Sequence, residues 1–135
     1  MRIRALVPLL LLACSCRNEP PLAATASREL PCDQDVAVER AGTAGEIYRA
    51  SGCGVRAYFY RTCWGAFNLE CKWLRVAPRA VEDLRCPAEQ IEYEGLERGM
   101  VRASGCGGET FYRRECNGDT CGWRLTADPR RPRAQ

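Results

Sequence analysis

Two stretches of the chain show the same succession of short hydrophobic runs separated by glycine. In the first, the strand-like runs Glu46 to Ser51 and Ala57 to Thr62 flank Gly52-Cys53-Gly54. In the second, Met100 to Ser104 and Thr110 to Arg114 flank the same three residues. Apolar runs on either side of a glycine-containing turn are typical of a β-hairpin. The pattern therefore predicts two hairpins.

Shorter runs extend each hairpin on both sides. Val36 to Val38 and Ile91 to Tyr93 read as short half-buried strands before the hairpins. Lys72 to Val76 and Gly122 to Thr126 read as closing strands, and each contains a tryptophan.

Helix-compatible stretches, Leu22 to Leu30 and Arg79 to Leu84, precede the two sets of strands. The predicted fold class is a small disulfide-rich α+β protein that is mostly β. It is a tandem repeat of a short helical turn followed by a three- to four-stranded antiparallel meander.

The repeat is explicit in the sequence, because six residues, Arg49-Ala50-Ser51-Gly52-Cys53-Gly54, recur unchanged from Arg102 to Gly107. Each copy lies inside a frame of four cysteines. The spacing differs only slightly between the frames, chiefly between the third and fourth cysteines, where a loop absorbs length changes. Internal duplication follows. The frames are Cys32, Cys53, Cys63, Cys71 and Cys86, Cys106, Cys116, Cys121.

Ten cysteines in an exported chain of 135 residues indicate a disulfide scaffold. Units of about 45 residues are too small for a hydrophobic core alone to hold them. Four cysteines allow three pairings. In a meander, the residue before the first strand lies near the end of the second strand, and the third and fourth strands also meet at one sheet end. This geometry predicts Cys32–Cys53, Cys63–Cys71, Cys86–Cys106 and Cys116–Cys121.

The N-terminus reads as an export signal over residues 1–13. Arg2 and Arg4 precede an apolar run that is too short to span a bilayer, which needs about 20 residues. Leu11-Leu12-Ala13-Cys14 resembles the lipobox of bacterial lipoproteins. The resemblance implies cleavage before Cys14 and attachment of lipid to that residue. The alternatives are an ordinary secretory signal that is cut elsewhere, and Cys16 as the attachment site.

The expected organisation continues with a lipid-anchored tether over 14–29. Cysteine repeat 1 follows at 30–76 and cysteine repeat 2 at 77–126. A basic flexible tail covers 127–135. Ser15, directly after the lipid-bearing cysteine, resembles the outer-membrane sorting pattern of Gram-negative lipoproteins. We therefore expect an outer-membrane lipoprotein on the periplasmic or surface face, in contact with the membrane through the lipid on Cys14.

The distribution of charged residues along the chain is not that of a nucleic-acid-binding protein. An export signal removes Arg2 and Arg4 from the 20 basic residues, which leaves 18 against 17 acidic residues. Neither repeat concentrates basic residues as nucleic-acid recognition requires. We expect no nucleic-acid partner.

The residues offer little catalytic or metal chemistry. Histidine is absent, which removes triads and His-based metal sites. The cysteine spacing lacks the two tight pairs of a zinc ribbon. Ser51 and Ser104 read as turn residues, and no phosphate-binding loop is present. The prediction is no enzyme, no cofactor and no metal. The acidic set in the second repeat reads as a solvated strand face: Glu89, Glu92, Glu94 and Glu97.

Six aromatic residues recur at matching positions and are expected in the core, although a ligand groove is the alternative. They are Tyr58, Phe59, Trp73, Phe111, Tyr112 and Trp123.

The motif Cys86-Pro87, then Gly-Cys-Gly, then an aromatic pair before the next cysteine resembles a pattern in uncharacterised exported lipoproteins of myxobacteria and their relatives. The resemblance covers residues 24–73 and 81–123, although Asp33 stands where the second copy has Pro87. The resemblance implies a location in the cell envelope and a repeated unit, and it implies no activity.

The leading functional hypothesis is a cell-envelope lipoprotein that displays two disulfide-stapled modules for binding an envelope protein or polysaccharide, or for a structural role. The alternatives are a protease-inhibitor-like or toxin-like scaffold and, less favoured, an enzyme with a site between the repeats. Any specificity is expected where the copies disagree, at Trp64 to Glu70 and Asn117 to Thr120. Whether the repeats share a core stays open at this point.

Overall fold

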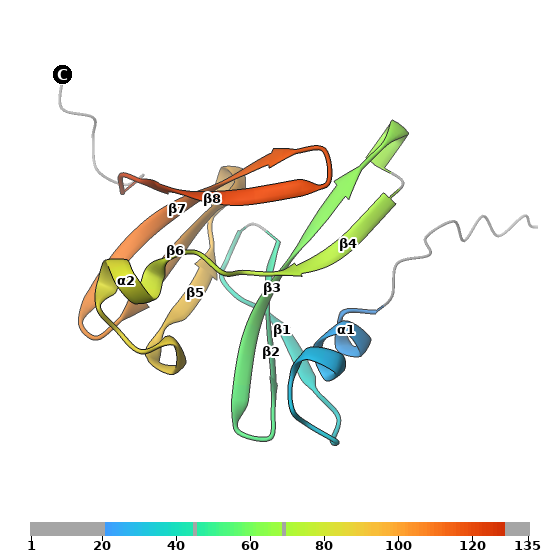
Figure 1. Ribbon diagram of the computed structural model, residues 1–135, viewed down its shortest axis with the longest axis horizontal. Helices are drawn as coiled ribbons and strands as arrows, with labels where there is room; N and C mark the ends of the chain where they lie inside the picture. Colours follow the sequence, from blue (N-terminus) through green and yellow to red (C-terminus); the bar gives the residue numbers. More distant parts are fainter. Residues whose placement is uncertain (1–20, 45, 69, 129–135) are drawn as a thin grey trace, which may run out of the picture.

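The chain forms two four-stranded antiparallel sheets, each preceded by a short helix (Figure 1). The computed structural model describes residues 21–44, 46–68 and 70–128. The expected export signal, Cys14, Cys16 and residues 129–135 of the basic tail lie outside the described residues. The predicted fold class is confirmed.

Module 1 is the first of these units, and its sheet has the strand order β1-β2-β3-β4. Its elements are α1 (Leu22–Glu29), β1 (Ala37–Arg40), β2 (Ile47–Gly52), β3 (Val55–Trp64), η1 (Ala66–Asn68) and β4 (Glu70–Arg75).

Module 2 repeats the plan with the strand order β5-β6-β7-β8. Its elements are α2 (Ala80–Leu84), η2 (Ala88–Gln90), β5 (Glu92–Gly95), η3 (Glu97–Gly99), β6 (Met100–Gly105), β7 (Gly108–Asn117) and β8 (Thr120–Thr126). The single-turn 3-10 segments η1, η2 and η3 were not predicted, because three residues carry no hydrophobic period.

The expected tether over 14–29 is too long, because Leu22–Glu29 form the helix α1. Leu22, Ala26 and Leu30 recur every four residues, so they form one apolar stripe on α1. All three are buried in a core cluster with Phe59. The helix therefore belongs to module 1, and repeat 1 begins eight residues earlier than the predicted boundary at 30.

The α1 face of the first sheet forms one of two core clusters. Phe59 is fully buried there, and Tyr48 and Trp73 pack at its margin with their rings edge to face at 5.2 Å. Ala50 and Ala57 face each other across β2 and β3, and both are buried. Two alanines opposite each other leave room for the helix to approach the sheet closely.

The opposite face of the first sheet forms the second cluster together with module 2. Side chains alternate between sheet faces, so Tyr58 and Tyr60 point away from Phe59. The modules therefore keep separate sheets but share one core. Its buried members are Ile47, Tyr58, Tyr60, Val76, Ala80, Cys86, Ile91, Val101, Ala103 and Tyr112.

Aromatic contacts span the boundary between the modules. The rings of Tyr58 and Tyr93 meet edge to face at 5.2 Å, and those of Tyr60 and Trp123 at 5.3 Å. The backbones of the two modules are also hydrogen-bonded to each other, since the Gly95 N–H donates to the Ala41 carbonyl at 2.7 Å. A side chain at Gly95 would not fit, because its Cβ would lie 2.6 Å from the Ala44 carbonyl oxygen.

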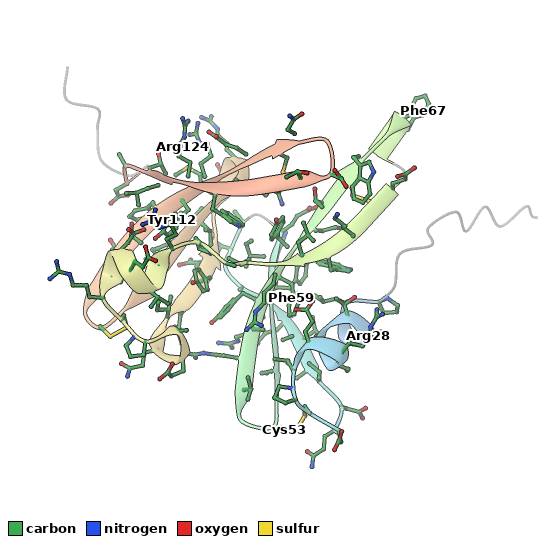
Figure 2. The ribbon with its side chains drawn as sticks, in the orientation of Figure 1. Arg28, Cys53, Phe59, Phe67, Tyr112 and Arg124 are labelled. Carbon is green, nitrogen blue, oxygen red and sulfur yellow. A yellow bond between two sulfur atoms is a disulfide. The ribbon has the colours of Figure 1, made fainter. Side chains whose placement is uncertain are left out.

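The predicted aromatic core agrees with the structure. Tyr58, Phe59, Phe111 and Tyr112 are buried (Figure 2 labels Phe59 and Tyr112). The two tryptophans are half-buried against the two clusters.

Four disulfides join the cysteines in the pairs that the meander predicts. Two of them tie the chain just after a helix to the turn of the first hairpin, with Cα–Cα distances of 5.5 Å for Cys32–Cys53 and 5.7 Å for Cys86–Cys106. The other two, Cys63–Cys71 and Cys116–Cys121, link directly opposed residues on neighbouring strands. Four disulfides in so short a chain indicate an oxidising, extracytoplasmic compartment.

The duplicated Gly-Cys-Gly is a turn built around a disulfide. Cys53 and Gly54 have φ values of 51° and 75°, and the second copy repeats this geometry. Positive φ at both central residues is the requirement of a type I′ hairpin turn. The preceding glycine makes room for sulfur, because a Cβ at Gly52 would lie 3.1 Å from Cys32 Sγ and one at Gly105 would lie 2.9 Å from Cys86 Sγ.

This crowding predicts that Gly105→Ala destabilises the fold. The added methyl group would also lie 2.8 Å from the Gln90 carbonyl oxygen, so the loop must shift. We expect a loss of about 1–3 kcal/mol in the free energy of unfolding, measured by urea denaturation. Gly122→Ala is the matched control, because a Cβ there meets nothing within 4 Å and should change stability by less than about 0.5 kcal/mol. Equal effects of the two substitutions would contradict the account of the motif.

The shared core predicts that both modules unfold together. Tyr58→Ala removes a module 1 side chain that contacts module 2. We expect the free energy of unfolding to fall by about 3–5 kcal/mol. Amide hydrogen exchange should show equal loss of protection in β2–β3 and β6–β7. Protection that persists in β6–β7 would mean that the modules are independent.

Candidate functional site

The tips of the β3–β4 and β7–β8 hairpins are where the two copies differ most. In module 2 the Cys116–Cys121 bond lies directly below a two-residue turn, Gly118-Asp119, with Asn117 opposite Thr120. Gly118 has a φ of 64°, as the first central residue of a type II′ turn requires. This tip is short and polar.

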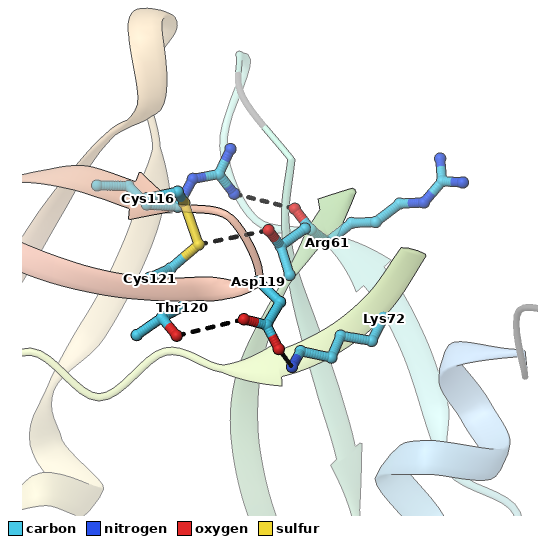
Figure 3. Close-up of a disulfide and its surroundings, with 8 residues drawn as sticks. Arg61, Lys72, Cys116, Asp119, Thr120 and Cys121 are labelled. Atoms are coloured by element: carbon cyan, nitrogen blue, oxygen red, sulfur yellow. Dashed lines mark hydrogen bonds and ion pairs between the residues drawn. A yellow bond between two sulfur atoms is a disulfide. The ribbon is translucent and has the colours of Figure 1, made fainter. Parts of the chain in front are cut away.

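The module 2 tip is occupied by contacts with module 1 (Figure 3). The Asp119 carboxylate lies 3.8 Å from Lys72 Nζ, and the Thr62 hydroxyl lies 3.3 Å from Cys121 Sγ. The Arg114 guanidinium donates to the Arg61 carbonyl at 3.0 Å. This turn therefore holds the two sheets together.

The module 1 tip is longer and carries an exposed aromatic side chain. Cys63 pairs with Cys71 and Trp64 with Glu70 at the end of the ladder, and η1 closes the loop. Phe67, within η1, is 93% exposed and lies at the far end of the hairpin (Figure 2). A single exposed apolar side chain is ordinary on a protein surface, so Phe67 gains weight only together with Trp64 at the same tip.

Local chemistry fixes the shape of this tip. The Cys63–Cys71 bond closes its base with a Cα–Cα distance of 4.1 Å. Gly65 and Phe67 both have positive φ, at 81° and 58°. Lys72 Nζ lies 5.0 Å from the centre of the Trp64 ring, a cation–π contact that holds the tryptophan against the strand. We call residues Trp64 to Phe67 the aromatic tip. The disagreement between the copies pointed to Trp64 to Glu70 but singled out no residue within it.

Two of the four acidic residues singled out in the second repeat form ion pairs. Glu92 pairs with Arg56 of module 1 at 3.0 Å, and Glu94 pairs with Arg102. The Glu89 backbone carbonyl accepts a hydrogen bond from Arg56 at 2.9 Å. Within the described residues, no group of three or more Cys, Asp or Glu side chains is arranged to hold a metal ion.

Two small cavities lie where the modules meet. The larger, about 250 Å³, is bordered by Tyr60, Trp123, Arg75 and Arg79. Arg79 is already paired with Glu82 at 2.6 Å. The smaller, about 140 Å³, lies between Ile47 and Met100. Neither reaches the roughly 300 Å³ that is usual for a small-molecule site.

Ser51 and Ser104 lie at matching positions in β2 and β6, each opposite a charged residue of the next strand, Arg56 and Glu109. Both are strand residues that precede the turn, so the prediction that they are turn residues is wrong. No helix in the described part of the chain is long and apolar enough to cross a membrane.

No protein family, curated protein or solved structure was found to match the chain.

One buried tyrosine couples the fold to alkaline pH. The Tyr112 hydroxyl donates to the Asp83 carboxylate of α2 at 2.5 Å. Burial, and then this hydrogen bond, raise the pKa of Tyr112 well above its usual value of 10. Because the folded state favours the neutral phenol, the stabilisation is fully present below about pH 10 and is lost as the pH rises toward the raised pKa.

We therefore expect the stability of the native protein to fall more steeply between pH 10 and 12 than that of Tyr112→Phe. At pH 7 the free energy of unfolding of the variant should be about 1–2 kcal/mol lower than that of the native protein, since one hydrogen bond to a carboxylate is removed. Urea denaturation across this pH range measures both effects. Parallel stability curves for the two proteins would show that Tyr112 does not carry the pH dependence.

Proposed function

We propose that the protein is a cell-envelope lipoprotein, anchored through Cys14, that acts by binding through the aromatic tip and not by catalysis. Its localisation is the outer membrane, on the periplasmic or surface face. The lipobox-like Leu11-Leu12-Ala13-Cys14 and the disulfide scaffold support this address.

The exposure of Phe67 is the observation that carries the binding role. A loop closed by a disulfide loses little backbone entropy when it binds, so the cross-linked tip is pre-organised for contact. Aromatic residues also dominate the energetics of binding surfaces. The second copy of the same hairpin lacks such a residue and is used internally, which supports a specialised role for the first.

The inhibitor-like alternative receives less support from the same tip. A disulfide-closed loop with an exposed Phe67 suits a protease pocket in composition. However, Phe67 has φ 58° and ψ 21°, in the left-handed region. Proteases that read a peptide as an added strand require an extended segment. An inhibitory role would therefore need a different mode of contact.

Lipid attachment is tested by intact-mass measurement of the mature protein from a Gram-negative host. The native chain and Cys16→Ala should begin at residue 14 and carry lipid, and both should fractionate with membranes. Cys14→Ala should carry none. A native protein without lipid, or lipid that persists in Cys14→Ala, would overturn the proposed anchor.

A further inference from the structure

We infer that the aromatic tip of module 1 inserts into the surface of the bilayer to which the chain is anchored, as a second membrane contact. The inference rests on the proposed lipid anchor at Cys14 and names the partner of the tip as a lipid surface.

The first step is the shape of the tip. Phe67 projects from the end of a hairpin on which Gly65 and Ala66 are exposed beside it and Glu70 is exposed at the start of β4. A stable protein interface buries about 800 Å² on each partner around a packed aromatic centre. Among the described residues next to Phe67, the exposed ones are small or charged and add little apolar surface to it. Such a tip suits a fluid interface, which closes around whatever enters it.

The second step is the chemistry of the tip. Tryptophan beside a lysine is typical of the boundary between lipid and water, where the ring is apolar and the headgroup region is polar. In this hairpin, Lys72 Nζ lies 5.0 Å from the centre of the Trp64 ring, three residues before Phe67 in the chain. Phe67 would enter the acyl boundary while the pair stays at headgroup level. The module 2 tip, Gly118-Asp119, has no apolar side chain to insert.

The third step is reach. Eight peptide links join Cys14 to Leu22, the first residue of α1. Even fully extended, they span at most about 29 Å, roughly the diameter of a domain this size. In Figure 1, α1 and the loop end of the β3–β4 hairpin both lie on the right of the view, with most of module 2 on the left. An anchor at Cys14 would therefore keep the folded chain, including the tip, close to the bilayer.

The fourth step is energetics. Burying one phenylalanine is worth roughly 1.5–3 kcal/mol, which is too little to recruit a free protein. An anchored chain needs no recruitment, because tethering turns the second contact into an intramolecular one at high effective concentration. One aromatic tip is then sufficient to orient module 1 on the membrane.

The test places the photoreactive residue p-benzoylphenylalanine at position 67 of the lipidated protein in cells. After irradiation, we expect a phospholipid adduct on the tip, at least fivefold more than with the same probe at position 125. Leu125 is the matched control, because it is also an exposed apolar residue, at 57%, but lies on β8 of module 2. Retention of all four disulfides shows that each probe-bearing protein is folded.

Each outcome separates the tip from the anchor. A protein adduct at position 67, or no adduct in a chain that carries lipid on Cys14, would overturn the inference and leave the anchor standing. A lipid adduct at position 67 in a chain without lipid on Cys14 would support the tip and overturn the anchor. Equal lipid adducts at positions 67 and 125 would also overturn the inference.

Discussion

The disulfide between the end of each helix and the turn of each first hairpin is the constraint on which the fold depends. Cys32–Cys53 and Cys86–Cys106 each close a loop of about 20 residues, which contributes roughly 3 kcal/mol in the chain-entropy model. Small domains have a total stability of only about 5–15 kcal/mol, so each bond is a large share. The bond also dictates local sequence: glycine before the second cysteine to admit sulfur, and glycine after it to complete the turn.

Each module alone is too small for a large core, and the two modules share one. The copies differ in sequence at positions in this shared core. Tyr60 is buried against Trp123, whereas its counterpart in module 2, Arg113, is exposed. Gly95 takes the place that Arg40 occupies in module 1 because the backbone of module 1 passes against it. At these two positions, residues that differ between the copies build the contact between the modules.

Local chemistry explains how much of the fold could be predicted. Glycine, cysteine and the two-residue period of strands act over a few residues, so the hairpins and the disulfide pairing followed from the sequence. The helix stripe at Leu22 was visible, but composition favoured a tether, and only its packing on Phe59 decides between them. Periodicity shows which face of an element is apolar but not what packs against that face. Neither the shared core nor the exposure of Phe67 could therefore be predicted.

Non-reducing peptide mapping tests the architecture most directly. Cleavage after arginine and lysine should release residues 29–40 linked to 50–56, and residues 86–98 linked to 103–113. Residues 62–72 and 115–124 should each carry an internal bridge. A peptide that links Cys32 to Cys63, or any bond between the two frames, would contradict the account.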